Sequence, residues 1–100
     1  MKYDLRFPSV SIEEKFRKVL ATLSQAMQDG IMEEIEKLSS RPYPYGDKGF
    51  LKLKPPIDIF NYIAQYRLRV GDYRILYDVD NKRRVVWILA LRRRNEQTYK

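Results

Sequence analysis

The chain has 100 residues, and its 20 Lys and Arg outnumber 13 Asp and Glu, which gives a net charge of +7. It has neither Cys nor His, so disulfides, thiolate metal sites and Ser–His or Cys–His catalysis are excluded. This length predicts one domain, residues 1–100, built around one hydrophobic core.

Hydrophobic residues make up 44% of the chain, which is ordinary for a globular protein. No apolar run approaches the ~18 residues of a membrane-spanning helix, and Met1–Asp4 lacks the apolar region of a secretory signal. We therefore expect a cytoplasmic protein with no membrane partner. The sequence also contains no Gly-rich phosphate loop and no set of metal ligands, so neither a cofactor nor a metal is expected.

The positive charge is concentrated toward the C-terminus. Residues 1–65 carry 10 basic and 9 acidic side chains, whereas residues 66–100 carry 10 basic and 4 acidic ones, a net of +1 against +6. A one-ended basic domain suits a polyanion, of which nucleic acid is the most plausible. A solvated, salt-bridged surface would have the same composition, so charge alone leaves both interpretations open.

The first element is predicted to be a strand. Residues 2–7 alternate between polar and apolar side chains, with Tyr3, Leu5 and Phe7 on one face. Pro8 is expected to end this strand, because proline cannot donate to a sheet ladder.

Two stripes of apolar residues at helical spacing predict a helical hairpin, with helices near 12–22 and 25–39. Ser11 and Glu14 have the spacing of a capping box, so the first helix is expected to begin near Ile12. The candidate caps between the two helices are Thr22 and Ser24. A single bent helix over the same residues is the alternative.

The second half of the chain is predicted to be a loop followed by strands. Residues 39–56 hold four of the five Pro and two of the four Gly, which is typical of a loop. Strands joined by short turns are expected at 59–70, 73–79 and 84–91. The last of them is nearly all apolar, so it is expected to be central and covered on both faces. A basic tail, 92–100, follows.

These elements predict an α+β fold, with an N-terminal strand, a helical hairpin and a three-strand antiparallel meander. The helices should cover one face of the sheet, because their apolar stripes would otherwise remain in water. The opposite face would be open and would carry the arginines.

Strand alternation brings three arginines together on that face. Arg67 and Arg69 point away from the apolar side of their strand, and so does Arg74 on the next strand. Neighbouring guanidiniums repel one another unless an anion lies among them. Each guanidinium can donate two parallel hydrogen bonds to phosphate oxygens, so the cluster predicts a phosphate site. Taken singly, each arginine could equally be a solubilising surface residue.

The segment YRLRVGDYRILYDVD (66–80), the apolar strand after it and RRRNEQTY (92–99) resemble the RelE/ParE superfamily of bacterial and archaeal toxins. The order of elements is also similar, including a KLK-type loop at Lys52–Lys54. The resemblance spans almost the whole chain and implies that residues 1–100 are a single RelE-like toxin domain.

The resemblance to the RelE type implies a toxin of a type II toxin–antitoxin system. Such toxins are ribosome-dependent endoribonucleases that cut mRNA in the A site. The ribose 2′-hydroxyl attacks the adjacent phosphate and the 5′-oxygen leaves, often without any His. The implied partners are a cognate antitoxin, the ribosome and mRNA. An acidic antitoxin helix is expected to cover an aromatic surface at Phe50, Tyr62 and Tyr66, and no oligomeric state is indicated.

The family's site residues are carried over by position. Arg67 and Arg69 match basic residues of the second strand and would hold the phosphate. Arg74 in the GDYR segment and Arg93, matched to an arginine just past the last strand, would stabilise the charge of the transition state. Tyr99 would stack on a base or assist proton transfer. The residues expected to bind RNA are Lys52, Lys54, Arg92 and Arg94, and Arg92 is also the alternative to Arg93.

One departure concerns the general base. The family often has Lys where this chain has Arg67 and Arg69, and Arg cannot give up its proton at working pH. The base is therefore open between Tyr99 and a group of the ribosome. Two other functions also stay open: a ParE-type inhibitor of DNA gyrase, and a decayed toxin that binds RNA and antitoxin without cutting.

Overall fold

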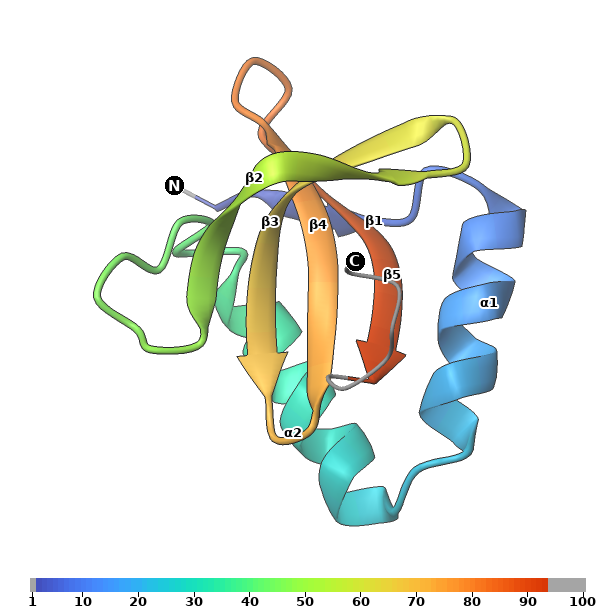
Figure 1. The fold of residues 1–100 in the computed structure, drawn as a ribbon. Coiled ribbons are helices and arrows are strands. Elements are labelled where there is room, and N and C mark those ends of the chain that lie inside the picture. The colour runs from blue at the N-terminus through green and yellow to red at the C-terminus, as the bar shows by residue number, and fades with distance from the viewer. Residues whose placement is uncertain (1, 94–100) are drawn as a thin grey trace.

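The computed structural model describes residues 2–93. These residues form two helices and five strands, in the order β1 (Asp4–Arg6), α1 (Val10–Ala21), α2 (Gln25–Lys37), β2 (Phe50–Ile59), β3 (Tyr62–Val70), β4 (Tyr73–Asp80) and β5 (Val85–Arg93) (Figure 1). The predicted α+β class is confirmed, but the meander has four strands rather than three.

All the strands belong to one sheet, in the order β1-β5-β4-β3-β2. Strands β2 to β5 pair antiparallel, and β1 pairs parallel with β5. The expectation that the apolar strand is covered on both faces is confirmed, since Val86 and Leu89 of β5 are each at most 2% exposed. Strand β5 therefore links the N-terminal strand to the meander.

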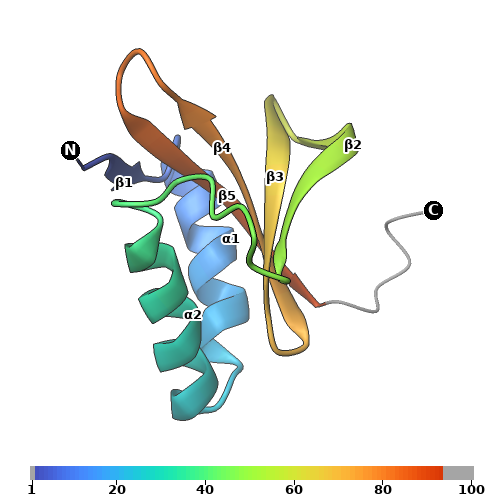
Figure 2. The same cartoon turned by 90° about the vertical axis from the view of Figure 1, so that its left-hand side faces the viewer.

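Both helices lie against one face of the sheet, as predicted (Figure 2). The predicted capping box is wrong, because Ser9 rather than Ser11 caps α1, its Oγ accepting from the Ile12 N–H at 3.2 Å. Ser24 caps α2 in the same way, accepting from the Met27 N–H at 3.2 Å. Within residues 2–93, neither helix is long and apolar enough to cross a membrane.

The predicted loop at 39–56 is wrong in its second half, where Phe50–Ile59 forms β2. Strand β2 lies at the edge of the sheet, and its register shifts between Lys52 and Ile57. Prolines are tolerated at an edge or an irregularity, where a missing N–H breaks no ladder bond. The strand predicted at 59–70 begins only at Tyr62, because Phe60 and the next residue form a turn.

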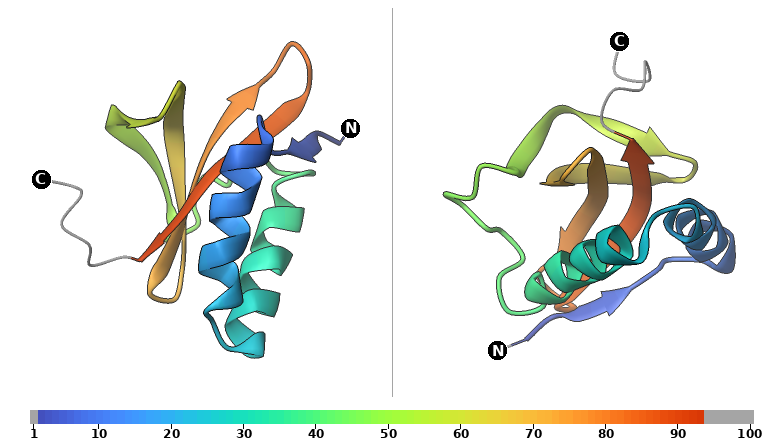
Figure 3. Two further views of the ribbon diagram at one scale, coloured as in Figure 1. Left: turned by 90° about the vertical axis from the view of Figure 1, so that its right-hand side faces the viewer. Right: turned by 90° about the horizontal axis from the view of Figure 1, so that it is seen from below.

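The sheet carries a hydrophobic core on each face, so the prediction of one open face is wrong. The larger core lies between the sheet and the helices, and its buried residues are Phe16, Leu20, Ile31, Ile35, Leu38, Leu68, Ile75, Tyr77, Val86, Ile88 and Leu91. We call the smaller cluster the second core, and it consists of Ile12, Leu53, Ile59, Ala64, Leu76 and Leu89. It forms because the β2–β3 hairpin curls over the sheet toward the start of α1 (Figure 3).

The loop between α2 and β2 is held by aromatic side chains. Tyr77 is fully buried, and its hydroxyl donates to the Pro42 carbonyl at 2.9 Å. The centroid of its ring lies 5.6 Å from that of Tyr66. The ring of Tyr66 in turn packs against those of Tyr43 and Phe50, with centroid distances of 5.2 Å and 5.8 Å. Burial raises the pKa of Tyr77 above its ordinary value, so the hydroxyl remains a donor at any physiological pH.

Candidate nucleic-acid interface

Three arginines from three adjacent strands lie directly opposite one another. Arg69 of β3 pairs with Arg74 of β4, and Arg74 pairs with Arg92 of β5. Opposite residues of an antiparallel pair share a face, and their Cβ atoms lie about 4.5–5.5 Å apart. We call this set the arginine row (Arg69, Arg74 and Arg92). It lies on the face of the sheet that the helices do not cover.

Arg67 lies on the same face as the arginine row, two residues along β3 from Arg69. Its partner on β4 is Leu76 of the second core. The structure thus brings together Arg67, Arg69 and Arg74, as strand alternation predicts.

Burial differs along the row, and its central arginine is the most buried of the three. Arg74 is only 3% exposed, whereas Arg69 is exposed and Arg92 is half-buried. The Nη2 of Arg74 donates to the Arg93 carbonyl at 3.4 Å. A guanidinium fixed among packed strands keeps its charge, and water screens it less than it screens a surface charge. The central guanidinium of the row, that of Arg74, is therefore charged and held in place by its surroundings.

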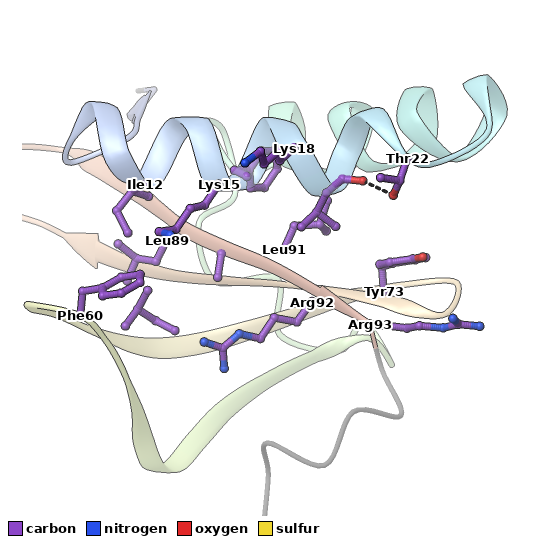
Figure 4. Close-up of a pocket in the computed structure, with 14 residues that line it drawn as sticks. Ile12, Lys15, Lys18, Thr22, Phe60, Tyr73, Leu89, Leu91, Arg92 and Arg93 are labelled. Atoms are coloured by element: carbon purple, nitrogen blue, oxygen red, sulfur yellow. Dashed lines mark hydrogen bonds between the residues drawn. The ribbon is translucent and has the colours of Figure 1, made fainter.

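Arg92 rather than Arg93 belongs to this row. Both residues lie within β5, so the expectation that Arg93 follows the last strand is wrong. Arg93 pairs with Tyr73, which places it on the opposite face from Arg92. The close-up shows the two side chains pointing in different directions (Figure 4).

Lys52 and Lys54, which are also predicted to contact RNA, do not lie beside the arginine row. Lys52 pairs with Tyr66, whose ring packs on the helix side of the sheet. Leu53 points into the second core, so strand alternation places Lys52 and Lys54 on the outer side of β2. Two further predicted residues, Arg94 and Tyr99, lie outside the described part of the chain.

A groove of about 600 Å³ runs between α1, β5 and the β2–β3 turn (Figure 4). Its apolar lining includes Phe16, Phe60 and Leu91. Within residues 2–93, the charged residues that line it are all basic, and these are Lys15, Lys18, Arg92 and Arg93. We call it the basic groove, and it reaches the arginine row through Arg92. Local sequence patterns do not indicate this groove, because α1 and β5 are far apart in the chain.

Comparisons with known proteins show a matching protein family and solved structures of similar fold. A family model described as "ParE toxin of type II toxin-antitoxin system, parDE" matches residues 9–98. No curated protein sequence gives a significant match. A solved structure of the archaeal RelE–RelB complex from Pyrococcus horikoshii OT3 is similar, with a TM-score of 0.71 and 26% identity over 96% of this chain and 99% of that chain.

Two bacterial structures are also similar in fold. The toxin–antitoxin complex RelBE2 from Mycobacterium tuberculosis has a TM-score of 0.60 and 23% identity, covering 94% of this chain and 100% of that one. A mutant of the E. coli toxin RelE in the free state has a TM-score of 0.57 and 16% identity, covering 98% and 90%.

Proposed function

This chain belongs to the ParE toxin family of type II toxin–antitoxin systems, within the RelE/ParE superfamily, and we propose that it is an endoribonuclease that cuts mRNA on the ribosome. The observation that carries this proposal is the arginine row, whose members share one face in direct cross-strand register. Arginines grouped on one face are suited to binding phosphate, and the phosphodiester is the group that a ribonuclease must activate.

The proposed reaction needs a stabilised phosphorane. The ribose 2′-oxygen bonds to the adjacent phosphorus, the bond from phosphorus to the 5′-oxygen breaks, and the products are a 2′,3′-cyclic phosphate and a 5′-hydroxyl end. Negative charge grows on the non-bridging oxygens during this step. Arg74 is the best placed to donate to them, because burial fixes it before the reaction. Arg69 and Arg92, on either side, would hold the phosphate and its neighbours.

The row cannot by itself move the protons. A guanidinium keeps its proton at any working pH, so another group must take the proton of the 2′-hydroxyl and supply one to the leaving 5′-oxygen. Tyr99 is the candidate within this chain, and a group of the ribosome is the candidate outside it. This division of roles fits an enzyme that cuts only within the ribosome.

The cognate antitoxin is proposed to bind the basic groove. The apolar lining of the groove and the basic residues described beside it suit an acidic amphipathic helix. The aromatic surface expected to bind the antitoxin is a weaker candidate, since Phe50 and Tyr66 are half-buried and their rings pack against Tyr45 and Tyr43 of the loop.

The test is cleavage of mRNA on programmed ribosomes, followed by primer extension. Removing one donor to a transition state typically lowers the rate by about 10²–10³. We expect this loss for Arg74→Ala and for Arg92→Ala, and less than about tenfold for Arg93→Ala, which lies on the other face. Arg83→Ala, at an exposed position in the β4–β5 turn, is the matched control. A double variant of Arg74 and Arg92 that still cuts at the wild-type rate would refute the proposal.

Inhibition of DNA gyrase is the second candidate, because the matching family model is that of ParE toxins. It is tested on the same purified protein by measuring the supercoiling of plasmid DNA. Loss of supercoiling with ribosome-bound mRNA left intact would replace the ribonuclease proposal with this one.

A further inference from the structure

A second pocket, of about 370 Å³, lies on the same face of the sheet as the arginine row but at the other end of β4. The residues that line it are Pro8, Tyr62, Ile63, Asp78, Trp87 and Leu89. Asp78 and Trp87 are cross-strand partners, so their side chains share this face. Asp78 is four residues from Arg74, which corresponds to about 13 Å along a strand. We call this the Asp78 pocket.

Among the described residues that line the pocket, Asp78 is the one with a charge, and the others are apolar or aromatic. One of its oxygens accepts from the Val79 N–H at 2.9 Å. Desolvation raises the pKa of the carboxyl group above its ordinary value, although this hydrogen bond acts in the opposite direction. An ionised carboxylate in such surroundings gains most from a cation that replaces its lost water.

Two nearby carboxylates, those of Asp4 and Asp80, have a cation of the described residues beside them, and Asp78 does not. Asp80 lies 3.9 Å from the guanidinium of Arg83, and Asp4 lies 3.3 Å from that of Arg6. Among residues 2–93, no Lys or Arg nitrogen lies within 4.0 Å of the Asp78 carboxylate. Although the chain has a net charge of +7, this pocket is thus a local region of negative charge that suits a bound cation.

We propose that the Asp78 pocket receives an arginine side chain from a protein partner. The guanidinium donates to the Asp78 carboxylate, with its planar face against the ring of Trp87 or Tyr62. The methylene stem packs on Ile63 and Leu89. Arginine fits better than lysine, because its flat and weakly hydrated head can stack and form two hydrogen bonds at once.

A protein side chain fits the pocket better than a nucleotide does. The carboxylate repels the phosphate of any nucleotide whose base enters. The second core, through Leu76, lies between the pocket and the arginine row, so RNA held at the row has no continuous polar path to Asp78. Guanine, which offers two adjacent N–H donors, is the competing occupant. The proposal does not depend on whether the chain cuts RNA.

Trp87 makes the test direct, because it is the only tryptophan of the chain and it lines the pocket. Nα-acetyl-argininamide is titrated against the whole protein while tryptophan fluorescence is followed. We expect a saturable change with a Kd on the order of 1 mM. Asp78→Asn should weaken binding at least about tenfold, since it removes the ion pair. Asp72→Asn, at an exposed position of the β3–β4 turn and thus at the other end of β4, should leave it unchanged.

Three outcomes would overturn the proposal: no saturable change with the arginine derivative, equal binding by Asp78→Asn and the wild type, or tighter binding of guanosine monophosphate than of the arginine derivative. Circular dichroism checks that Asp78→Asn is folded. If it is not, the wild type is titrated at falling pH instead. Binding should then weaken as the carboxyl group takes up its proton, and binding that persists at pH ~3, below the usual carboxyl pKa, would contradict the ion pair.

Discussion

Replacing Tyr77 by Phe removes one buried hydroxyl while keeping the ring that packs against Tyr66. The Pro42 carbonyl then loses the donor that lies 2.9 Å away. Leaving a buried acceptor without its partner costs about 1–3 kcal/mol, so we expect Tyr77→Phe to lower the free energy of unfolding by about 1–2 kcal/mol at pH 7. For a domain of this size, each kcal/mol corresponds to a fall in Tm of about 4–8 °C.

The effect should depend on pH in a predictable direction. Burial raises the pKa of Tyr77 in the folded state, whereas in the unfolded chain a tyrosine ionises near pH ~10. The contribution of the neutral Tyr77 hydroxyl to the free energy of unfolding is therefore complete below pH ~10 and is lost as the pH rises above it. The loss is up to about 1.4 kcal/mol per pH unit, and Tyr77→Phe does not suffer it. The difference between the two proteins should shrink by up to this amount between pH ~10 and ~11.

Urea denaturation followed by circular dichroism at pH ~7, ~10 and ~11 measures both effects. Tyr45→Phe is the matched control, because Tyr45 is 67% exposed and its loss should change stability by less than about 0.5 kcal/mol. A difference between Tyr77→Phe and the wild type that stays constant up to pH ~11 would refute the claim that the hydroxyl is desolvated. No difference at pH ~7 would refute the role of its hydrogen bond.

Three further substitutions test other parts of the structure. Leu76→Ala should lower the free energy of unfolding, measured by urea denaturation, by about 2–5 kcal/mol, because Leu76 is 0% exposed in the second core. Leu51→Ala, at a position that is 47% exposed, should lower it far less. Equal losses for the two variants would contradict the existence of that core. Ser24→Ala should cost about 1 kcal/mol in thermal denaturation through loss of the α2 cap. Asp78→Asn should slightly raise the free energy of unfolding at pH ~7, measured by thermal denaturation, by less than about 1 kcal/mol after allowance for solvent screening. The reason is that ionisation of a carboxyl group with a raised pKa costs stability as the pH rises. This gain should vanish at pH ~3, and a gain that persists there would have another cause.

Local patterns in the sequence predict most of the elements but not the extent of the sheet. Helical spacing and strand alternation are properties of neighbouring residues, so the two helices and strands β3, β4 and β5 are predicted from them. Pro55 and Pro56 favour a loop locally, yet their segment belongs to β2, because pairing with β3 outweighs local preference at an edge strand. The second core is not predicted from local patterns either, because it depends on how the β2–β3 hairpin curls over the sheet.

Local patterns likewise predict one part of the candidate site and not the other. Alternation within β3 and β4 is enough to place Arg67, Arg69 and Arg74 on one face. The choice between Arg92 and Arg93 depends on how β5 pairs with β4, and a register shift between Leu76 and Tyr77 makes that pairing hard to count from the sequence. Neighbouring residues also give no sign of the Asp78 pocket, because its lining comes from the β1–α1 connection and from three strands.

The two outer strands decide where the sheet stops growing. Strand β1 has only three residues, and β2 is interrupted by Pro55 and Pro56, which have no N–H to offer. A long, regular outer strand would be a template on which other molecules could stack into fibres. The irregular β2, with its two prolines and shifted register, is therefore a poor template for the pairing of further strands.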